Sequence, residues 1–152
     1  MAASDYQCIY EVLHVIEQVK PRSILDVGVG FGKWGIMCRD ILEIDRGRLL
    51  PDTWLTRIDG IKIYEPYAKA LGGFAYNHLY VGDPLEIMDR LENYDVILCG
   101  DVIEHFDKET CRLFLSKMLD RANIVIMTCL RMSFFRRSGF ATEEGFAAIP
   151  HV

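Results

Sequence analysis

A glycine-rich segment between an expected strand and an expected helix restricts the folds open to this chain more than any other feature. Residues 23–27 form a short apolar run, Gly28, Gly30 and Gly32 follow, and apolar residues then repeat at helical spacing from Trp34. Glycine adopts positive φ and lets a ligand touch the backbone, and a helix start offers N–H groups without helical partners. In this setting the loop is expected to bind a ligand rather than only to turn the chain.

The spacing of the loop disfavours two common nucleotide-binding motifs. A phosphate-binding loop ends in Gly-Lys followed by Ser or Thr, whereas Lys33 is followed by Trp34. A dinucleotide loop, G-x-G-x-x-G, requires glycine at the position of Lys33 and an acidic residue about 20 residues further on. The acidic candidate, Glu65, lies 39 residues after Asp26. These departures disfavour a nicotinamide-dependent oxidoreductase.

Apolar periodicity predicts that helices and strands alternate along the chain. Asp83 followed by Pro84 is a typical helix start. Strands that alternate with helices form a parallel sheet covered on both faces. The predicted strands are residues 23–27, 57–64, 78–81, 94–99 and 123–128; the predicted helices are 4–20, one from about 34, a short one at 67–71, one from 84 and one at 108–120; residues 45–57 are predicted to be a connecting loop.

Length and composition limit the domain count, the partners and the compartment. The 152 residues suit a single domain, and the formal net charge of −5 does not indicate nucleic-acid binding, although a local basic patch leaves it open. No apolar run reaches the roughly 18–20 residues of a membrane span, and the start lacks a signal-peptide pattern. The absence of such a run predicts no membrane partner. Five cysteines without CxxC spacing predict reduced thiols and a cytoplasmic protein.

The loop sequence Asp-Val-Gly-Val-Gly-Phe-Gly, which begins at Asp26, resembles the first motif of class I S-adenosylmethionine-dependent methyltransferases. Acidic segments resemble later motifs of that family in the same order, and the resemblance covers roughly residues 5–130. It implies an α/β class, a three-layer α-β-α Rossmann-like fold with a largely parallel sheet in the order 3-2-1-4-5. The segments are Glu65 after the second strand, Asp83 after the third, and Asp101 with Glu104 and His105 after the fourth.

The resemblance also implies the cofactor S-adenosyl-L-methionine. Asp26 is expected near its amino-acid end, Glu65 on its ribose hydroxyls and Asp83 near its adenine amine. Sulfonium is a good leaving group, so catalysis would consist mainly of in-line positioning and exclusion of water. The expected cofactor-binding residues are Asp26, Gly28, Gly30, Gly32, Glu65, Asp83 and Asp101, and the catalytic candidates are Asp101 and His105.

Each of these residues also has an explanation without a ligand. Asp83 can be a helix cap alone, Glu65 a strand end in solvent, and His105 a packing residue. Asp101 and Glu104 can be first-turn residues favoured by the helix dipole. The D-x-x-E-H spacing is similar to the E-x-x-E-H of metal-dependent 2′-O-methyltransferases that act on small-RNA 3′ ends. Because the first position is Asp and no clear second histidine follows the fifth strand, no metal is expected.

The end of the chain is shorter than the family pattern. That pattern has seven strands, the last two forming an antiparallel hairpin, and residues 130–152 are predicted to be an irregular tail after an N-terminal helix (4–20) and a cofactor-binding core (23–129). An open edge at residues 123–128 would favour a homo-oligomer unless the tail covers it. Arg131, Arg136 and Arg137 among phenylalanines are candidates for contact with a phosphate-bearing substrate, or a solvated segment.

The sequence thus favours a methyltransferase acting on an unidentified acceptor. The alternative is a module that binds S-adenosylmethionine or a nucleoside without turnover and acts through assembly.

Overall fold

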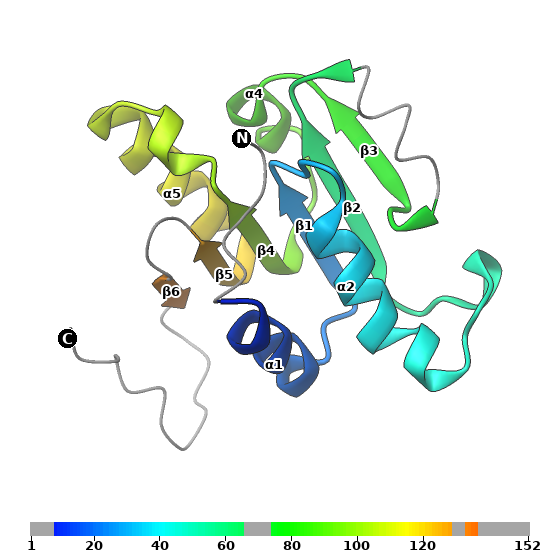
Figure 1. Ribbon diagram of the computed structural model, residues 1–152. Helices are drawn as coiled ribbons and strands as arrows, with labels where there is room; N and C mark the ends of the chain where they lie inside the picture. Colours follow the sequence, from blue (N-terminus) through cyan, green and yellow to red (C-terminus); the bar gives the residue numbers. More distant parts are fainter. Residues whose placement is uncertain (1–7, 66–73, 129–132, 137–152) are drawn as a thin grey trace.

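The computed structural model describes residues 8–65, 74–128 and 133–136 (Figure 1). Within these residues six strands form one sheet in the order β3-β2-β1-β4-β5-β6. The first five strands run parallel to one another and lie in the predicted order 3-2-1-4-5. The strands are β1 (Ser23–Val27), β2 (Arg57–Lys62), β3 (His78–Val81), β4 (Tyr94–Gly100), β5 (Ala122–Thr128) and β6 (Ser133–Arg136).

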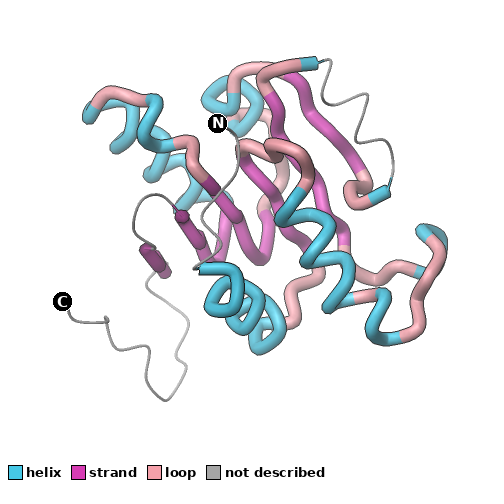
Figure 2. Tube along the Cα trace, in the orientation of Figure 1, coloured by secondary structure: helices cyan, strands magenta, loops and turns pink. Residues whose placement is uncertain are grey.

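Helices cover both faces of this sheet, as Figure 2 shows, so the fold has the predicted three layers. Helices α1 (Ile9–Val19) and α2 (Lys33–Leu42) pack on one face, where Ile16 and Cys38 meet Ile24. Helices α4 (Pro84–Met88) and α5 (Lys108–Arg121) pack on the other, where Phe114 meets Leu25. Each central strand is therefore buried on both sides, which explains why strands read as continuous apolar runs.

The helix boundaries follow local capping. The αL residue Lys20 (φ 49°) ends α1 just before Pro21. The Asp83 carboxylate accepts a hydrogen bond from the Leu85 N–H (2.8 Å) and caps α4, as the sequence predicted. The Asp107 carboxylate caps α5 by accepting from the Glu109 and Thr110 N–H groups. The predicted start of the first helix and the predicted helix at 67–71 lie outside the described residues.

The connection predicted as a loop at 45–57 contains two short 3-10 helices, η2 (Ile44–Arg46) and η3 (Pro51–Thr53). Its anchor is the buried Glu43 carboxylate, which accepts from the Leu55 N–H (3.0 Å) and the Thr56 N–H (2.6 Å) and pairs with Arg48. Burial acts to raise the pKa of Glu43, but the hydrogen bonds from Arg48 and Thr56 hold that pKa below its usual value. This connection is therefore ordered by one buried carboxylate.

The far edge of the sheet differs from the open edge that the sequence suggested. β6 pairs antiparallel with β5, from Ile124 opposite Arg136 to Met127 opposite Ser133. Residues 133–136 therefore cover the edge of the fifth strand, which is the alternative that the sequence left open. Within the described residues, β6 is the one strand beyond β5 in the sheet. Arg131 and Arg137 lie outside the described residues.

Among the described helices, none combines the length and the apolar character needed to cross a membrane.

Candidate functional site

The glycine loop lies at the carboxyl end of β1, between the ends of β2 and β4 (Figure 1). At this point the strand order reverses, because β2 lies beside β1 on one side and β4 lies beside it on the other. In open α/β sheets this switch point is where ligands bind. The loop is tied to β2, since the N–H groups of Gly28 and Val29 both donate to the Ile61 carbonyl (3.1 and 3.2 Å).

The backbone of the loop needs glycine. Gly28, Gly30 and Gly32 all have positive φ, at 82°, 56° and 83°, a region that other residues rarely adopt. A Cβ on Gly28 would lie 2.2 Å from a methyl group of Val102, which follows β4. Gly28 therefore serves the close contact between the glycine loop and the segment after β4, and it also permits the turn.

A second glycine, Gly60 within β2, has a related role. A Cβ there would lie 2.5 Å from a methyl group of Val29 and 2.8 Å from Leu79. A glycine inside a strand usually weakens that strand. In the structure Gly60 instead lets the glycine loop pack directly over β2.

Asp26 is fully buried on the face of the sheet that α2 covers. The Tyr76 hydroxyl donates to Asp26 Oδ2 (2.6 Å) and accepts from the Gly35 N–H (3.2 Å), so it connects the carboxylate to the first turn of α2. Asp26 Oδ1 is buried and has no hydrogen-bond partner among the described residues. Burial raises the pKa of Asp26 to about 6, although the Tyr76 hydrogen bond and the Lys62 charge act to lower it.

Tyr76 is a site residue that the sequence reasoning missed. Its ring fills the space above Gly35, where a Cβ would lie 2.2 Å from Cζ of the ring. Burial, with the neighbouring Asp26, raises the pKa of the Tyr76 hydroxyl above its usual value, so the group stays a proton donor. The only sequence signal for Tyr76 is Gly35. A glycine in the first turn of a helix indicates that another group packs closely there, but it does not identify that group.

Lys62 is the second residue that sequence reasoning missed. β2 ends at Lys62, and this side chain is buried, with its ammonium donating to the Gly30 carbonyl in the glycine loop. Burial lowers the pKa of Lys62, and the nearby Asp26 partly offsets this. The predicted strand extended to residue 64 with Glu65 at its end. In the structure Glu65 lies three residues beyond the strand and is exposed.

The predicted residues after β3 and β4 lie at the same edge of the sheet. Asp83 is exposed and caps α4. Asp101 has φ 52°, a left-handed conformation that costs energy in a non-glycine residue, and its N–H donates to the Thr128 carbonyl (2.8 Å). Glu104 and His105 are exposed on a 3-10 helix, Ile103–His105, instead of beginning α5.

The structure thus brings Gly28 against Val102 in the segment after β4. It adds Tyr76 beside Asp26 and Lys62 beside Gly30. Over the part of the chain that is described, no three His, Cys, Asp or Glu side chains cluster as a metal site. The binding and catalytic roles expected for the site residues stay predictions.

No protein family profile matches this sequence, and no curated protein matches it. Several solved structures match its fold. The methyltransferase domain of bacterial CtHen1-C has a TM-score of 0.56 and 19% identity over 80% of this chain. Magnesium protoporphyrin IX methyltransferase from Synechocystis, with S-adenosylhomocysteine bound, has a TM-score of 0.55 and 17% identity over 80%. An S-adenosylmethionine-dependent methyltransferase from Archaeoglobus fulgidus has a TM-score of 0.53 and 19% identity over 81%.

The chain covers 63%, 53% and 57% of these three proteins, so it spans less than two thirds of their length. Identities this low make the likeness one of fold. The chain therefore has the Rossmann-like fold of class I S-adenosylmethionine-dependent methyltransferases.

Proposed function

We propose that this protein is an S-adenosylmethionine-dependent methyltransferase that transfers the sulfonium methyl group to an unidentified acceptor. The observation that carries the proposal is the left-handed glycine loop at the switch point between β1 and β4. The fold supports it, and one protein of similar fold has S-adenosylhomocysteine bound.

The residues at this edge fit such a cofactor. Asp26 Oδ1 is a buried acceptor without a partner among the described residues, and a buried acceptor of this kind favours a nearby donor such as the ammonium of an amino acid. The loop glycines allow close approach to the backbone, and the ribose hydroxyls can accept from the Lys62 ammonium or donate to Glu65. Together these groups supply the donors and acceptors that the cofactor needs.

When bound, the cofactor supplies an electrophilic methyl group on a sulfonium. The residues of this chain then have positioning roles. Asp26 and the glycine loop hold the amino-acid end, and Asp101, in its strained conformation beside the loop, orients the reacting edge. In this proposal the imidazole of His105, which is exposed, accepts the proton that the acceptor loses as its bond to the methyl group forms. This division of roles needs no further covalent chemistry from the protein.

A binding module without turnover is the second candidate, and Lys62 is the observation that favours it. The resemblance places a carboxylate at the end of the second strand, where this structure has a buried ammonium in contact with the glycine loop. A cation there disfavours a sulfonium more than it disfavours the neutral thioether of S-adenosylhomocysteine. This candidate therefore predicts tighter binding of S-adenosylhomocysteine than of S-adenosylmethionine, and no methyl transfer.

Calorimetric titration with S-adenosylhomocysteine, S-adenosylmethionine and NADH tests these proposals. Binding should weaken roughly tenfold in Lys62→Gln or Glu65→Gln if that residue holds the ribose, since a hydrogen bond to a charged group contributes about 1.5–3 kcal/mol. Glu109→Gln, at an exposed position on α5, is the matched control and should bind normally. Binding of NADH alone would contradict both candidates, and methyl transfer to any acceptor distinguishes the first from the second.

A cytoplasmic location belongs to this proposal. Its support is that Cys38 and Cys111 are free thiols, as expected in a reducing compartment.

A further inference from the structure

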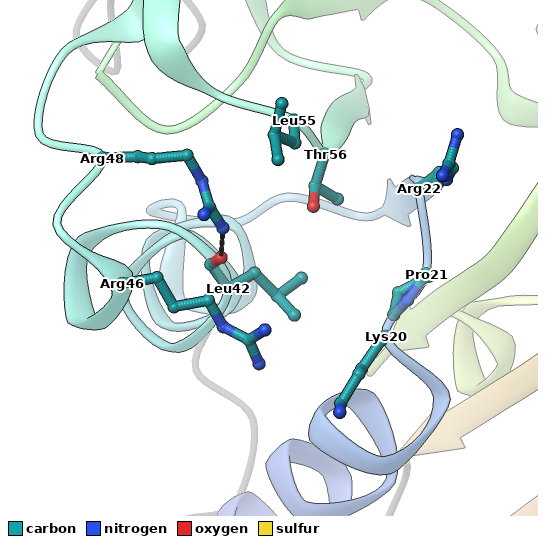
Figure 3. A pocket seen from close by; sticks show the side chains of 8 residues that line it. All are labelled: Lys20, Pro21, Arg22, Leu42, Arg46, Arg48, Leu55 and Thr56. Carbon is teal, nitrogen blue, oxygen red and sulfur yellow. Dashed lines mark hydrogen bonds between the residues drawn. The ribbon is translucent and has the colours of Figure 1, made fainter.

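A cavity of about 280 Å³, whose lining side chains are drawn in Figure 3, lies at the opposite end of the sheet from the glycine loop. Its walls come from segments that precede β1 and β2 and from the end of α2 and the residues after it, which places it at the amino ends of these parallel strands. The lining residues are Lys20, Pro21, Arg22, Leu42, Arg46, Arg48, Leu55 and Thr56.

The lining of this cavity is strongly basic. Four of the eight residues are cationic and none is acidic, although the whole chain carries a net charge of −5. Within the described part of the chain, neither Lys20 nor Arg22 has a side-chain ion pair, and the Nε of Arg46 donates to the Ile41 carbonyl (3.4 Å). Positive charge is therefore concentrated here against the average charge of the molecule.

Among the four cationic side chains that line the cavity, Glu43 neutralises the charge of one, Arg48. Glu43 is buried and pairs with Arg48. The Arg48 guanidinium also donates to the Leu42 carbonyl, the hydrogen bond drawn in Figure 3. Arg48 is thereby fixed in place. The remaining charges belong to Lys20, Arg46 and Arg22.

The segments that carry these charges are held by the backbone. Lys20 sits in an αL conformation with its N–H donating to the Ile16 carbonyl, and the buried Pro21 follows it. In Figure 3 the side chains of Lys20 and Arg46 extend toward the same space from different elements, whereas Arg22 points away from them. Arg22 thus belongs to the rim, and Lys20 and Arg46 flank the opening.

We propose that this cavity binds a small phosphorylated ligand through Lys20, Arg46 and Arg48. A phosphate group matches it because guanidinium and ammonium groups on different elements can each donate to different oxygens of one compact anion. The volume is near the low end for small-molecule sites, and Leu42, Leu55 and Thr56 provide a wall for the carbon part of a phosphate ester. The proposal is independent of the proposed function, since it uses none of the residues at the glycine loop.

Isothermal titration at constant ionic strength, with inorganic pyrophosphate and with ribose 5-phosphate, tests this inference. The wild-type protein should bind at least one of them saturably. The doubly substituted Lys20→Gln/Arg46→Gln variant should bind roughly tenfold more weakly, because each exposed charge pair contributes up to about 1 kcal/mol. Tighter binding of ribose 5-phosphate identifies a phosphate ester as the ligand class, and tighter binding of pyrophosphate identifies a free phosphate.

The matched control is Lys108→Gln/Arg112→Gln, which removes the same charge from exposed positions on α5 and should bind like the wild type. Both variants should keep the wild-type melting temperature, since the substituted side chains are exposed. The proposal is overturned if neither compound binds the wild type, if the two double variants lose affinity equally, or if sodium chloride at the same ionic strength produces the same heat.

Discussion

Replacing the buried carboxylate of Asp26 by an amide should stabilise this protein at neutral pH while weakening cofactor binding. In Asp26→Asn the amide oxygen can still accept the Tyr76 hydrogen bond that Oδ2 accepts now (2.6 Å). The amide nitrogen takes the place of Oδ1, which has no partner among the described residues. The substitution thus removes the charge and little of the packing.

The size of the effect follows from the pKa of Asp26, which burial raises from 3.8 to about 6. Between these two values the folded protein binds more protons than the unfolded chain, so the free energy of unfolding falls as pH rises. The stability that the protonated carboxyl provides is fully present below about pH 4 and is lost as pH rises through about 6. At about 1.36 kcal/mol for each pKa unit, the loss is roughly 3 kcal/mol.

Urea unfolding of the wild type and of Asp26→Asn, from pH 3.5 to pH 7.5, measures this loss. Subtracting the two free energies of unfolding removes the contributions of the other titrating groups. The free energy of unfolding of Asp26→Asn should rise relative to that of the wild type by roughly 3 kcal/mol between pH 4 and pH 7. Affinity for S-adenosylhomocysteine should fall roughly tenfold in the same variant. A stability difference that stays constant with pH would refute the reasoning, because Asp26 would then titrate at its ordinary pKa.

Three further substitutions test the packing described above, each by denaturant unfolding. Gly28→Ala should destabilise by about 1–3 kcal/mol, since it adds a Cβ at φ 82° against Val102; an unchanged midpoint would refute that contact. Glu43→Gln should cost about 3 kcal/mol or more, because it leaves Arg48 without its buried partner; a loss below 1 kcal/mol would contradict an anchoring role. Asp107→Ala should lower the unfolding midpoint through the lost helix cap and leave S-adenosylhomocysteine affinity unchanged; weaker binding would contradict a purely structural cap.

The parallel core of the fold could be predicted from the sequence, because its signals are local. Apolar runs such as residues 123–128 mark buried strands, and Asp83 before Pro84 marks a helix start through capping alone. The short strand at 133–136 could not be predicted in this way. Its existence depends on pairing with β5, which a four-residue segment does not specify by itself.

The candidate site could be predicted only in part, for the same reason. The glycine loop is contiguous in sequence, and its positive φ values are a local requirement. Tyr76 and Lys62 reach the loop from other elements, through contacts that depend on how β2 and the segment before β3 pack. The sequence prediction places Glu65 at the end of the second strand, because the apolar pattern continues to residue 64. β2 ends at Lys62, and the Lys62 ammonium contacts the loop there.

A crystal structure of the protein grown with S-adenosylhomocysteine tests the central claim most directly. The account predicts electron density for the ligand across residues 28–32, with a polar contact to Asp26 or Lys62. Density for the ligand at another surface, with the glycine loop empty at saturating concentration, would contradict the claim that this loop is the cofactor site.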